Sequence, residues 1–226
     1  MHIGLIVGIG PAATDFYYRS LIHRMADLGV ALELTMAHAD TSTLLRNQEG
    51  GQIGAQVAIY ERLTRRLQAA GARAVAVTSI AGHFCIDEFA AVSPVPVINL
   101  LKSVEDEVAA RRYRTVALLG TQGVMESRLF GSLRGVEVLA PDAHTIGAVH
   151  DAYVSMAQSG VCTDQQRAVF VDAGQEMVSQ GGAQAILLAG TDLVLAFGNH
   201  EPGFPVVDCA SVHAAAIADV AFDDMR

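Results

Sequence analysis

The chain has 226 residues, of which 51% are hydrophobic and 17% are charged. This length suits two small domains with a substantial core, and the composition excludes an intrinsically disordered chain. The formal net charge of −9 provides no basic footprint for nucleic acid, so we expect no nucleic-acid partner.

The three cysteines, Cys85, Cys162 and Cys209, lie far apart and form no C-x-x-C pair. This spacing is typical of a protein in a reducing compartment rather than of a disulfide framework or a zinc ribbon. No apolar run is long enough to span a membrane, and the first residues lack the features of a signal peptide. We therefore expect a cytoplasmic protein without a membrane partner.

Short apolar runs predict strands, and longer segments with helical spacing between them predict crossover helices. Strands are expected at 3–7, 32–36, 74–77, 95–98, 115–119, 136–139, 185–188 and 205–207. Helices are expected at 12–28, 52–70, 102–112, 145–159, 164–180 and 210–222. This alternation indicates an α/β fold with parallel sheets covered on both faces.

An internal repeat divides the chain. Residues 3–8, 70–79 and 95–100 resemble residues 115–120, 181–190 and 204–209, so each block recurs about 110 residues later in the same order. We expect two similar lobes, one formed by 1–100 plus 210–226 and the other by 101–209. Ligands of parallel sheets bind beyond the carboxyl ends of the strands, which predicts a cleft shared by the two lobes.

The segment Gly8-Ile9-Gly10-Pro11-Ala12-Ala13-Thr14 follows the first strand and opens a helix. As a G-x-G-x-x-A motif it could bind a dinucleotide, with Asp40 on the ribose hydroxyls. It could also be a tight turn with Pro11 at the helix start, or a turn whose backbone N–H groups hold a substrate carboxylate.

Ser79 and His83 follow the third strand, and Thr191 and Asp192 follow its repeat. Ser79 and His83 could form a nucleophile–base pair, although no G-x-S-x-G elbow surrounds them. The structural alternative is that Ser79 and Thr191 cap short helices and Asp192 is an acidic residue of a first turn. Residues 199–202 lack metal-ligand spacing, and we expect no metal site.

Several short motifs occur in a characteristic order. They are Gly8-x-Gly10-Pro11-x-Ala13-Thr14, Tyr17-Tyr18-Arg19, His38-x-Asp40, Gln48, Ser79-x-x-x-His83, Gly120-Thr121 followed by Met125, Gly190-Thr191-Asp192, and Asp208 with His213. In this order and spacing the chain resembles, over essentially its whole length, the cofactor-independent aspartate/glutamate racemase superfamily. It is most similar to the aspartate and broad-specificity amino-acid racemases.

The resemblance implies two pseudo-symmetric Rossmann-like lobes, each a mostly parallel four-stranded sheet flanked by helices, with the active-site cleft between them. It implies a homodimer, a small carboxylate or amino-acid substrate, and neither pyridoxal phosphate nor metal. In the family one thiol from each lobe removes or delivers the α-proton, a task suited to a group that titrates near pH 8.5.

The sequence departs from the family at both thiol positions, which hold Ser79 and Gly190. Two-thiol racemisation is therefore excluded, and none of the three cysteines stands at a family catalytic position. We expect Ser79, His83 and Asp192 to be catalytic. The expected substrate-binding residues are Ile9, Gly10, Gln48, Ile80, Ala81, Thr121, Gly190 and Thr191.

Three functions remain open. The first is an isomerase or lyase that performs α-proton chemistry on a small carboxylate without a cofactor. The second is a catalytically degenerate member that binds a carboxylate without turnover, and the third is a nucleotide-binding oxidoreductase. Ile80 and Ala81 stand where relatives hold an Asn-Thr pair, which favours a less polar pocket and allows a hydrophobic or aromatic carboxylate.

Overall fold

The computed structural model describes residues 1–8, 10–198 and 200–223. The chain divides into two compact units, Met1–Leu100 with Ser211–Arg226 and Leu101–Ala210. Each unit is built on a four-stranded sheet in which the assigned strand pairs are all parallel. The predicted α/β fold with two four-stranded sheets flanked by helices is confirmed.

The sheet of the first unit has the strand order β2-β1-β3-β4. Its strands are β1 (Ile3–Val7), β2 (Leu34–His38), β3 (Ala74–Val77) and β4 (Val97–Ile98). The helices of this unit are α1 (Pro11–Asp27), α2 (Thr41–Glu49), α3 (Ile53–Ala69), the 3₁₀ helix η1 (Ala81–Cys85), α4 (Ile86–Val92) and α10 (Cys209–Asp223). Every residue of β1 and β3 is buried, as expected for central strands covered on both faces.

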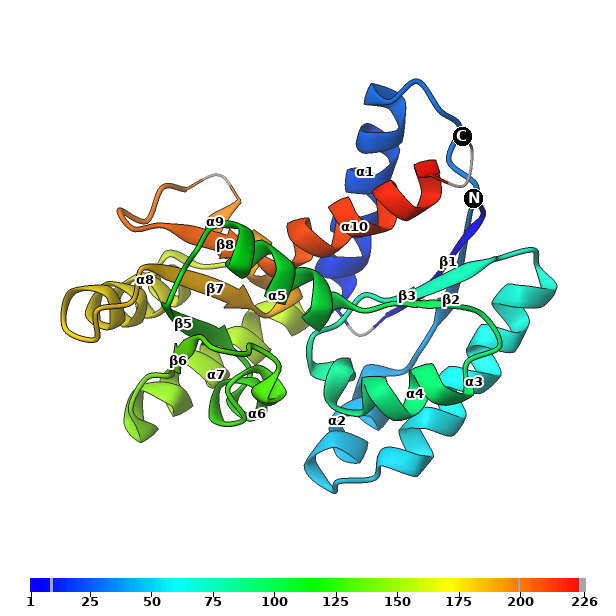
Figure 1. Cartoon of the computed structure of the whole chain (residues 1–226). Coiled ribbons are helices and arrows are strands. Elements are labelled where there is room, and N and C mark those ends of the chain that lie inside the picture. The colour runs from blue at the N-terminus through cyan, green and yellow to red at the C-terminus, as the bar shows by residue number, and fades with distance from the viewer. Residues whose placement is uncertain (9, 199, 224–226) are drawn as a thin grey trace. The chain divides into compact units, whose positions relative to one another are not determined.

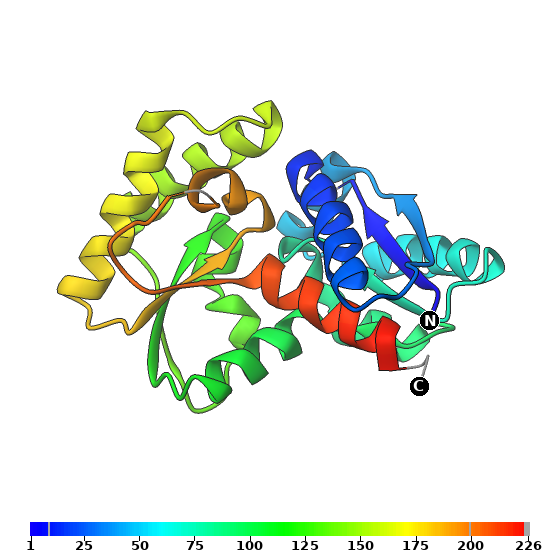
Figure 2. The same ribbon diagram turned by 90° about the horizontal axis from the view of Figure 1, so that it is seen from above.

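Helices cover both faces of this first sheet. Figures 1 and 2 show α1 and α10 side by side, and Figure 1 shows them on one face with α2, α3 and α4 on the other. The Met1 ammonium group donates a hydrogen bond of 2.6 Å to the Ala221 carbonyl, which ties β1 to the end of α10. The first unit is therefore completed by a helix from the far end of the sequence.

The sheet of the second unit has the order β6-β5-β7-β8, the same pattern as the first. Its strands are β5 (Thr115–Gly120), β6 (Glu137–Leu139), β7 (Ala185–Ala189) and β8 (Val206–Asp208). Its helices are α5 (Leu100–Ala110), α6 (Gln122–Glu126), the 3₁₀ helix η2 (Leu129–Gly131), α7 (Ala143–Ser159), α8 (Asp164–Ser179), the 3₁₀ helix η3 (Thr191–Leu193) and α9 (Val194–Phe197).

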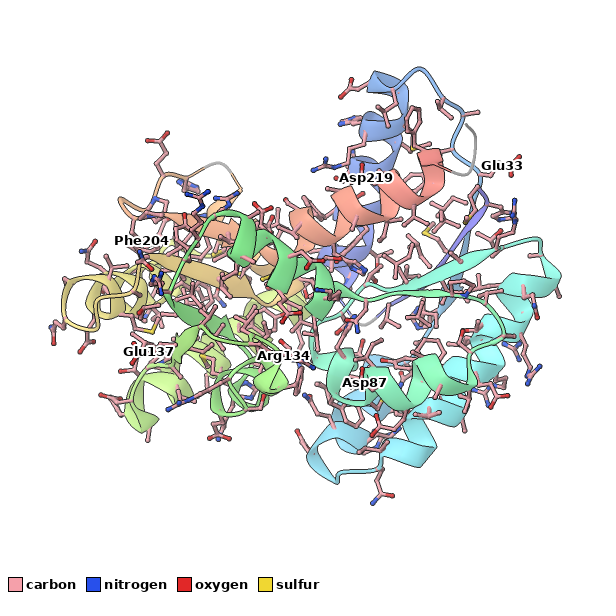
Figure 3. All side chains as sticks on the ribbon, viewed as in Figure 1. Glu33, Asp87, Arg134, Glu137, Phe204 and Asp219 are labelled. Atoms are coloured by element: carbon pink, nitrogen blue, oxygen red, sulfur yellow. The ribbon has the colours of Figure 1, made fainter. Side chains whose placement is uncertain are left out.

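The core of the second unit forms around β5 and β7, with α7 and α8 packed on each other and on β5. Phe204 is buried and lies against Gly174 of α8, where a Cβ atom would collide with its ring. Figure 3 labels Phe204 together with Arg134 and Glu137, two exposed charged residues of the same unit. Among the described residues, no helix combines the length and apolar character needed to cross a membrane.

One strand was predicted at the wrong residues, and one helix was not predicted. The strand expected at 32–36 runs instead from Leu34 to His38 because β2 pairs with β1 residue by residue up to the Val7–His38 pair. As an edge strand with half-exposed side chains it does not need a continuous apolar run. Helix α2 was not predicted because Leu44 is its one buried residue, although Asp40 caps it by accepting a hydrogen bond from the Thr43 N–H.

A left-handed turn follows α6 in the second unit. Arg128, Leu129, Phe130 and Gly131 all have positive φ angles, of 51°, 57°, 57° and 67°. This conformation costs roughly 1–2 kcal/mol for each residue with a side chain. The side chain of Leu129 is fully buried and anchors the turn.

Candidate functional site

In the first unit, the predicted residues Ser79, Ile80, Ala81 and His83 lie together where β3 ends and η1 begins, and all are buried. The Ser79 hydroxyl accepts a hydrogen bond of 3.2 Å from the Gly82 N–H, which is the contact expected of a helix cap. His83 Nδ1 lies 2.6 Å from the Ser79 carbonyl oxygen. His83 therefore contacts the backbone of Ser79.

Both ring nitrogens of His83 are engaged. Nδ1 donates to the Ser79 carbonyl, and Nε2 accepts a hydrogen bond of 3.2 Å from the Leu100 N–H. A carbonyl can only accept and an N–H can only donate, so these partners fix the neutral tautomer. Burial lowers the pKa of His83 to about 4, although its bond to Ser79 opposes the shift. His83 is thus a neutral residue that holds two backbone segments in place.

A second buried histidine adjoins the first. His213 of α10 accepts a hydrogen bond of 2.9 Å from the Tyr17 hydroxyl of α1 and donates one of 3.0 Å to the Ile98 carbonyl. Its ring meets that of His83 edge-on, with centroids 6.0 Å apart. Burial is the main cause that lowers the pKa of His213 to about 3, and nearby His83 adds to the effect. This cluster joins α1, η1 and α10 of the first unit.

Two further predicted residues of the first unit, Gly10 and Gln48, lie on other elements. Gly10 is the buried N-terminal cap of α1, and Gln48 is half-buried on α2, a helix that packs against η1. The Thr14 hydroxyl accepts from the Gly8 N–H and donates to the Gly10 carbonyl, so the side chain of Thr14 stabilises the turn internally. Ile9 lies outside the described residues.

In the second unit, the predicted residues occupy the ends of the paired strands β5 and β7. Thr121 follows β5, and Gly190, Thr191 and Asp192 follow β7. All four are buried. The Thr121 hydroxyl oxygen is buried and has no hydrogen-bond partner among the described residues. The buried hydroxyls of Thr64 and Ser132 share this state, and at the end of β5 the Thr121 hydroxyl is available to a ligand or a water.

The sequence reasoning missed Tyr153 of α7. Its hydroxyl donates a hydrogen bond of 3.1 Å to Asp192 Oδ2, and its ring occupies the volume beside Gly190 that a side chain would need. Burial raises the pKa of Tyr153 well above its usual value, and the nearby Asp192 carboxylate raises it further. The signal that could have found it is the helical spacing of Ile146, Val149 and Tyr153, which turns the phenol inward.

The same helix makes a second contact with the strand ends. His150 lies one turn before Tyr153, and its Nδ1 accepts a hydrogen bond of 3.2 Å from the Gln122 N–H, at the start of α6. Helix α7 therefore carries polar side chains to the residues that follow both β5 and β7.

The sequence model of the Asp/Glu/Hydantoin racemase family matches residues 6–217. The chain belongs to this family. Among solved structures, a proposed Asp/Glu racemase from Yersinia pestis is 25% identical, with a TM-score of 0.82 over 98% of this chain and 99% of that chain.

Two further racemase-family structures share the fold. An aspartate racemase homologue from Pyrococcus horikoshii is 22% identical, with a TM-score of 0.79 over 97% of this chain and 98% of that one. The aspartate racemase of Picrophilus torridus is 19% identical, with a TM-score of 0.75 over 98% of this chain and 94% of that one.

In this Asp/Glu/Hydantoin racemase family member, the cysteines are poorly suited to proton transfer. Cys85, Cys162 and Cys209 are free thiols, and burial raises the pKa of each. For Cys85 the pKa reaches about 12, with Glu88 as a second cause. Because a thiol must ionise to act as a base, burial disfavours such a role for these side chains.

Proposed function

We propose that this protein performs α-proton chemistry on a small carboxylate or amino acid without a cofactor. The observation that carries the proposal is that each unit, taken by itself, has buried polar side chains at the carboxyl ends of its central strands. These are Ser79 after β3 in the first unit, and Thr121 after β5 with Thr191 and Asp192 after β7 in the second. Ligands of open parallel sheets bind at such ends. Membership of a racemase family supports a carboxylate as the ligand.

The contacts support separate roles for the three residues that we expect to be catalytic. The Gly82 N–H uses an acceptor site of the Ser79 hydroxyl, which leaves its proton for a ligand. His83 fits a positioning role because both its nitrogens hold backbone groups. Asp192 is the buried carboxylate that could accept a proton, and hydroxyls and backbone N–H groups could stabilise the carbanion-like transition state.

The experiment is a proton-NMR screen for α-deuterium incorporation in deuterated water, across amino acids and 2-substituted dicarboxylates. Exchange by the wild-type protein is expected for at least one compound. Ser79→Ala should abolish that exchange, whereas Ser179→Ala, an exposed serine at the end of α8, should leave it unchanged. Full activity of Ser79→Ala would refute the role of Ser79.

A second candidate is a family member that binds a carboxylate without turning it over. The observation that favours it is the engagement of both His83 nitrogens, which removes the obvious base for Ser79. In that case calorimetry detects a carboxylate ligand in the same screen but no α-proton exchanges. Any enzyme-dependent exchange rules this candidate out.

The nucleotide-binding oxidoreductase has weaker support. The Asp40 carboxylate caps α2 through the Thr43 N–H, and the Gly8 N–H is bonded to Thr14, so groups that a dinucleotide would use already have partners. Calorimetric titration with NAD(H) and NADP(H) should give no heat of binding. A homodimer, a cytoplasmic location and independence of cofactors stay predictions.

A further inference from the structure

A side chain from helix α7 fills the space beside Gly190. A Cβ atom built on Gly190 would meet Tyr153 Cε2 and would lie 2.8 Å from Cζ of the same ring. The phenol ring therefore fills the space that a larger residue 190 would need. The Tyr153 hydroxyl is directed toward Asp192, which lies two residues after Gly190.

The pair is buried and well defined. Tyr153 is 8% exposed and Asp192 is 1% exposed, and the Tyr153 hydroxyl donates to Asp192 Oδ2 over 3.1 Å. The Thr121 hydroxyl, which has no hydrogen-bond partner among the described residues, follows β5, the strand that pairs with β7. A hydroxyl and a carboxylate therefore follow two adjacent strands of one sheet, and the phenol that binds the carboxylate comes from α7.

We propose that Tyr153 and Asp192 form a proton relay that serves one face of the substrate α-carbon. The inference rests on the proposed α-proton chemistry. In the forward direction the α-C–H bond breaks and its proton forms a new bond to Tyr153 Oη. At the same time the original Tyr153 hydroxyl proton passes to Asp192 Oδ2. The electron pair of the C–H bond stays on the substrate as its carbanion, and the reverse sequence reprotonates the carbon.

The relay agrees with the environment of the phenol. Burial and the neighbouring carboxylate raise the pKa of Tyr153 well above its usual value, so a free phenolate is unfavourable there. In a concerted transfer Tyr153 is neutral before and after the step, and the charge moves from Asp192 to the substrate. In this proposal the Thr121 hydroxyl, which follows the adjacent strand β5, donates a hydrogen bond to that charge or to the substrate carboxylate.

The test compares Tyr153→Phe and Asp192→Asn with the wild-type protein. Tyr153→Phe keeps the ring beside Gly190 and removes only the hydroxyl, whereas Asp192→Asn removes the proton acceptor. The matched control is Tyr113→Phe, because Tyr113 precedes β5 at the opposite end of the strand. The probes are both enantiomers of aspartate and of phenylglycine in deuterated water, with α-proton exchange followed by proton NMR.

We expect both relay variants to lose roughly 10²- to 10⁴-fold in exchange rate, the usual contribution of a positioned acid or base. The loss should be larger for one enantiomer of each pair because the relay serves one face of the carbon. If Tyr153→Phe fails to fold, the rate and the enantiomer bias of Asp192→Asn carry the test.

The outcomes separate the relay from the proposed function. If the wild-type protein exchanges neither probe, the proposed function fails for these substrates and the relay fails with it. If the wild-type protein exchanges a probe and both variants match its rate, only the relay is overturned. Equal losses for both enantiomers indicate a purely structural role and also overturn the relay.

Discussion

At the scale of single residues, position 190 has no side chain, and an aromatic ring from helix α7 fills the space beside it. Gly190 leaves room beside the end of β7, and the ring of Tyr153 occupies that room while its hydroxyl is held by Asp192. The two positions are therefore coupled through shared volume. A substitution that introduces a thiol at position 190 therefore also affects Tyr153.

Gly190→Cys should destabilise the protein by about 1–3 kcal/mol because the new Cβ overlaps a buried ring. In a Tyr153→Ala background the same substitution should cost less, since the ring is gone. Urea unfolding of the four proteins of this double-mutant cycle measures the coupling. Additive effects of the two substitutions would show that the ring and the new side chain do not compete for the same space.

At the scale of elements, the left-handed turn after α6 is the most strained segment of the described chain. Three residues with side chains, Arg128, Leu129 and Phe130, adopt positive φ angles in succession. Such strain persists where the surroundings enforce it, and here the buried Leu129 side chain holds the turn beside the residues that follow β5.

Arg128→Gly should stabilise the protein by roughly 0.5–1 kcal/mol because glycine adopts a positive φ without steric cost. This gain in free energy exceeds the cost that comes from the greater conformational freedom of glycine in the unfolded chain. Arg128 is exposed, so little packing is lost. Arg134→Gly, an exposed arginine without a positive φ, is the control and should not stabilise. Thermal unfolding measures the melting temperatures of both variants. A melting temperature of Arg128→Gly below that of the wild-type protein would contradict the prediction.

Much of the fold could be predicted because apolar runs and the internal repeat mark the buried central strands directly. Edge strand β2 was misplaced and α2 was missed because neither carries a strong apolar pattern. For the candidate site, the positions of Ser79, Thr121 and Asp192 after β3, β5 and β7 could be predicted from the apolar runs that precede them. Their functional role, expected because ligands bind at strand ends, stays a prediction. The positions of Tyr153 and the Tyr17–His213 contact could not be predicted, since both depend on packing between distant helices.

At the scale of the whole molecule, the two buried histidines of the first unit couple stability to pH. Both have pKa values below the unfolded value near 6.5, about 4 for His83 and about 3 for His213. Below pH 6.5 the unfolded chain therefore binds protons that the folded chain does not. Stability should fall as pH decreases from 6.5 toward 4, and these residues should have little effect above that range.

For each proton that the unfolded chain binds and the folded chain does not, the free energy of unfolding falls by about 1.4 kcal/mol per unit of decreasing pH. His213→Gln can still accept from Tyr17 and donate to the Ile98 carbonyl, but it does not titrate. Urea unfolding of this variant between pH 7.5 and pH 5 should show a shallower loss of stability than the wild-type protein shows. The exposed His144→Gln serves as the control, and identical slopes for all three proteins would contradict this account.

Helix α10 has a consequence for synthesis of the chain. The first unit needs this helix for the partner of Tyr17 and for the contact of the Met1 ammonium with Ala221, yet it follows the whole second unit in sequence. A nascent chain emerges from the ribosome amino end first and folds unit by unit. The second unit can therefore close while the first still exposes the surface that α10 covers, so the unit translated first is the last to finish folding.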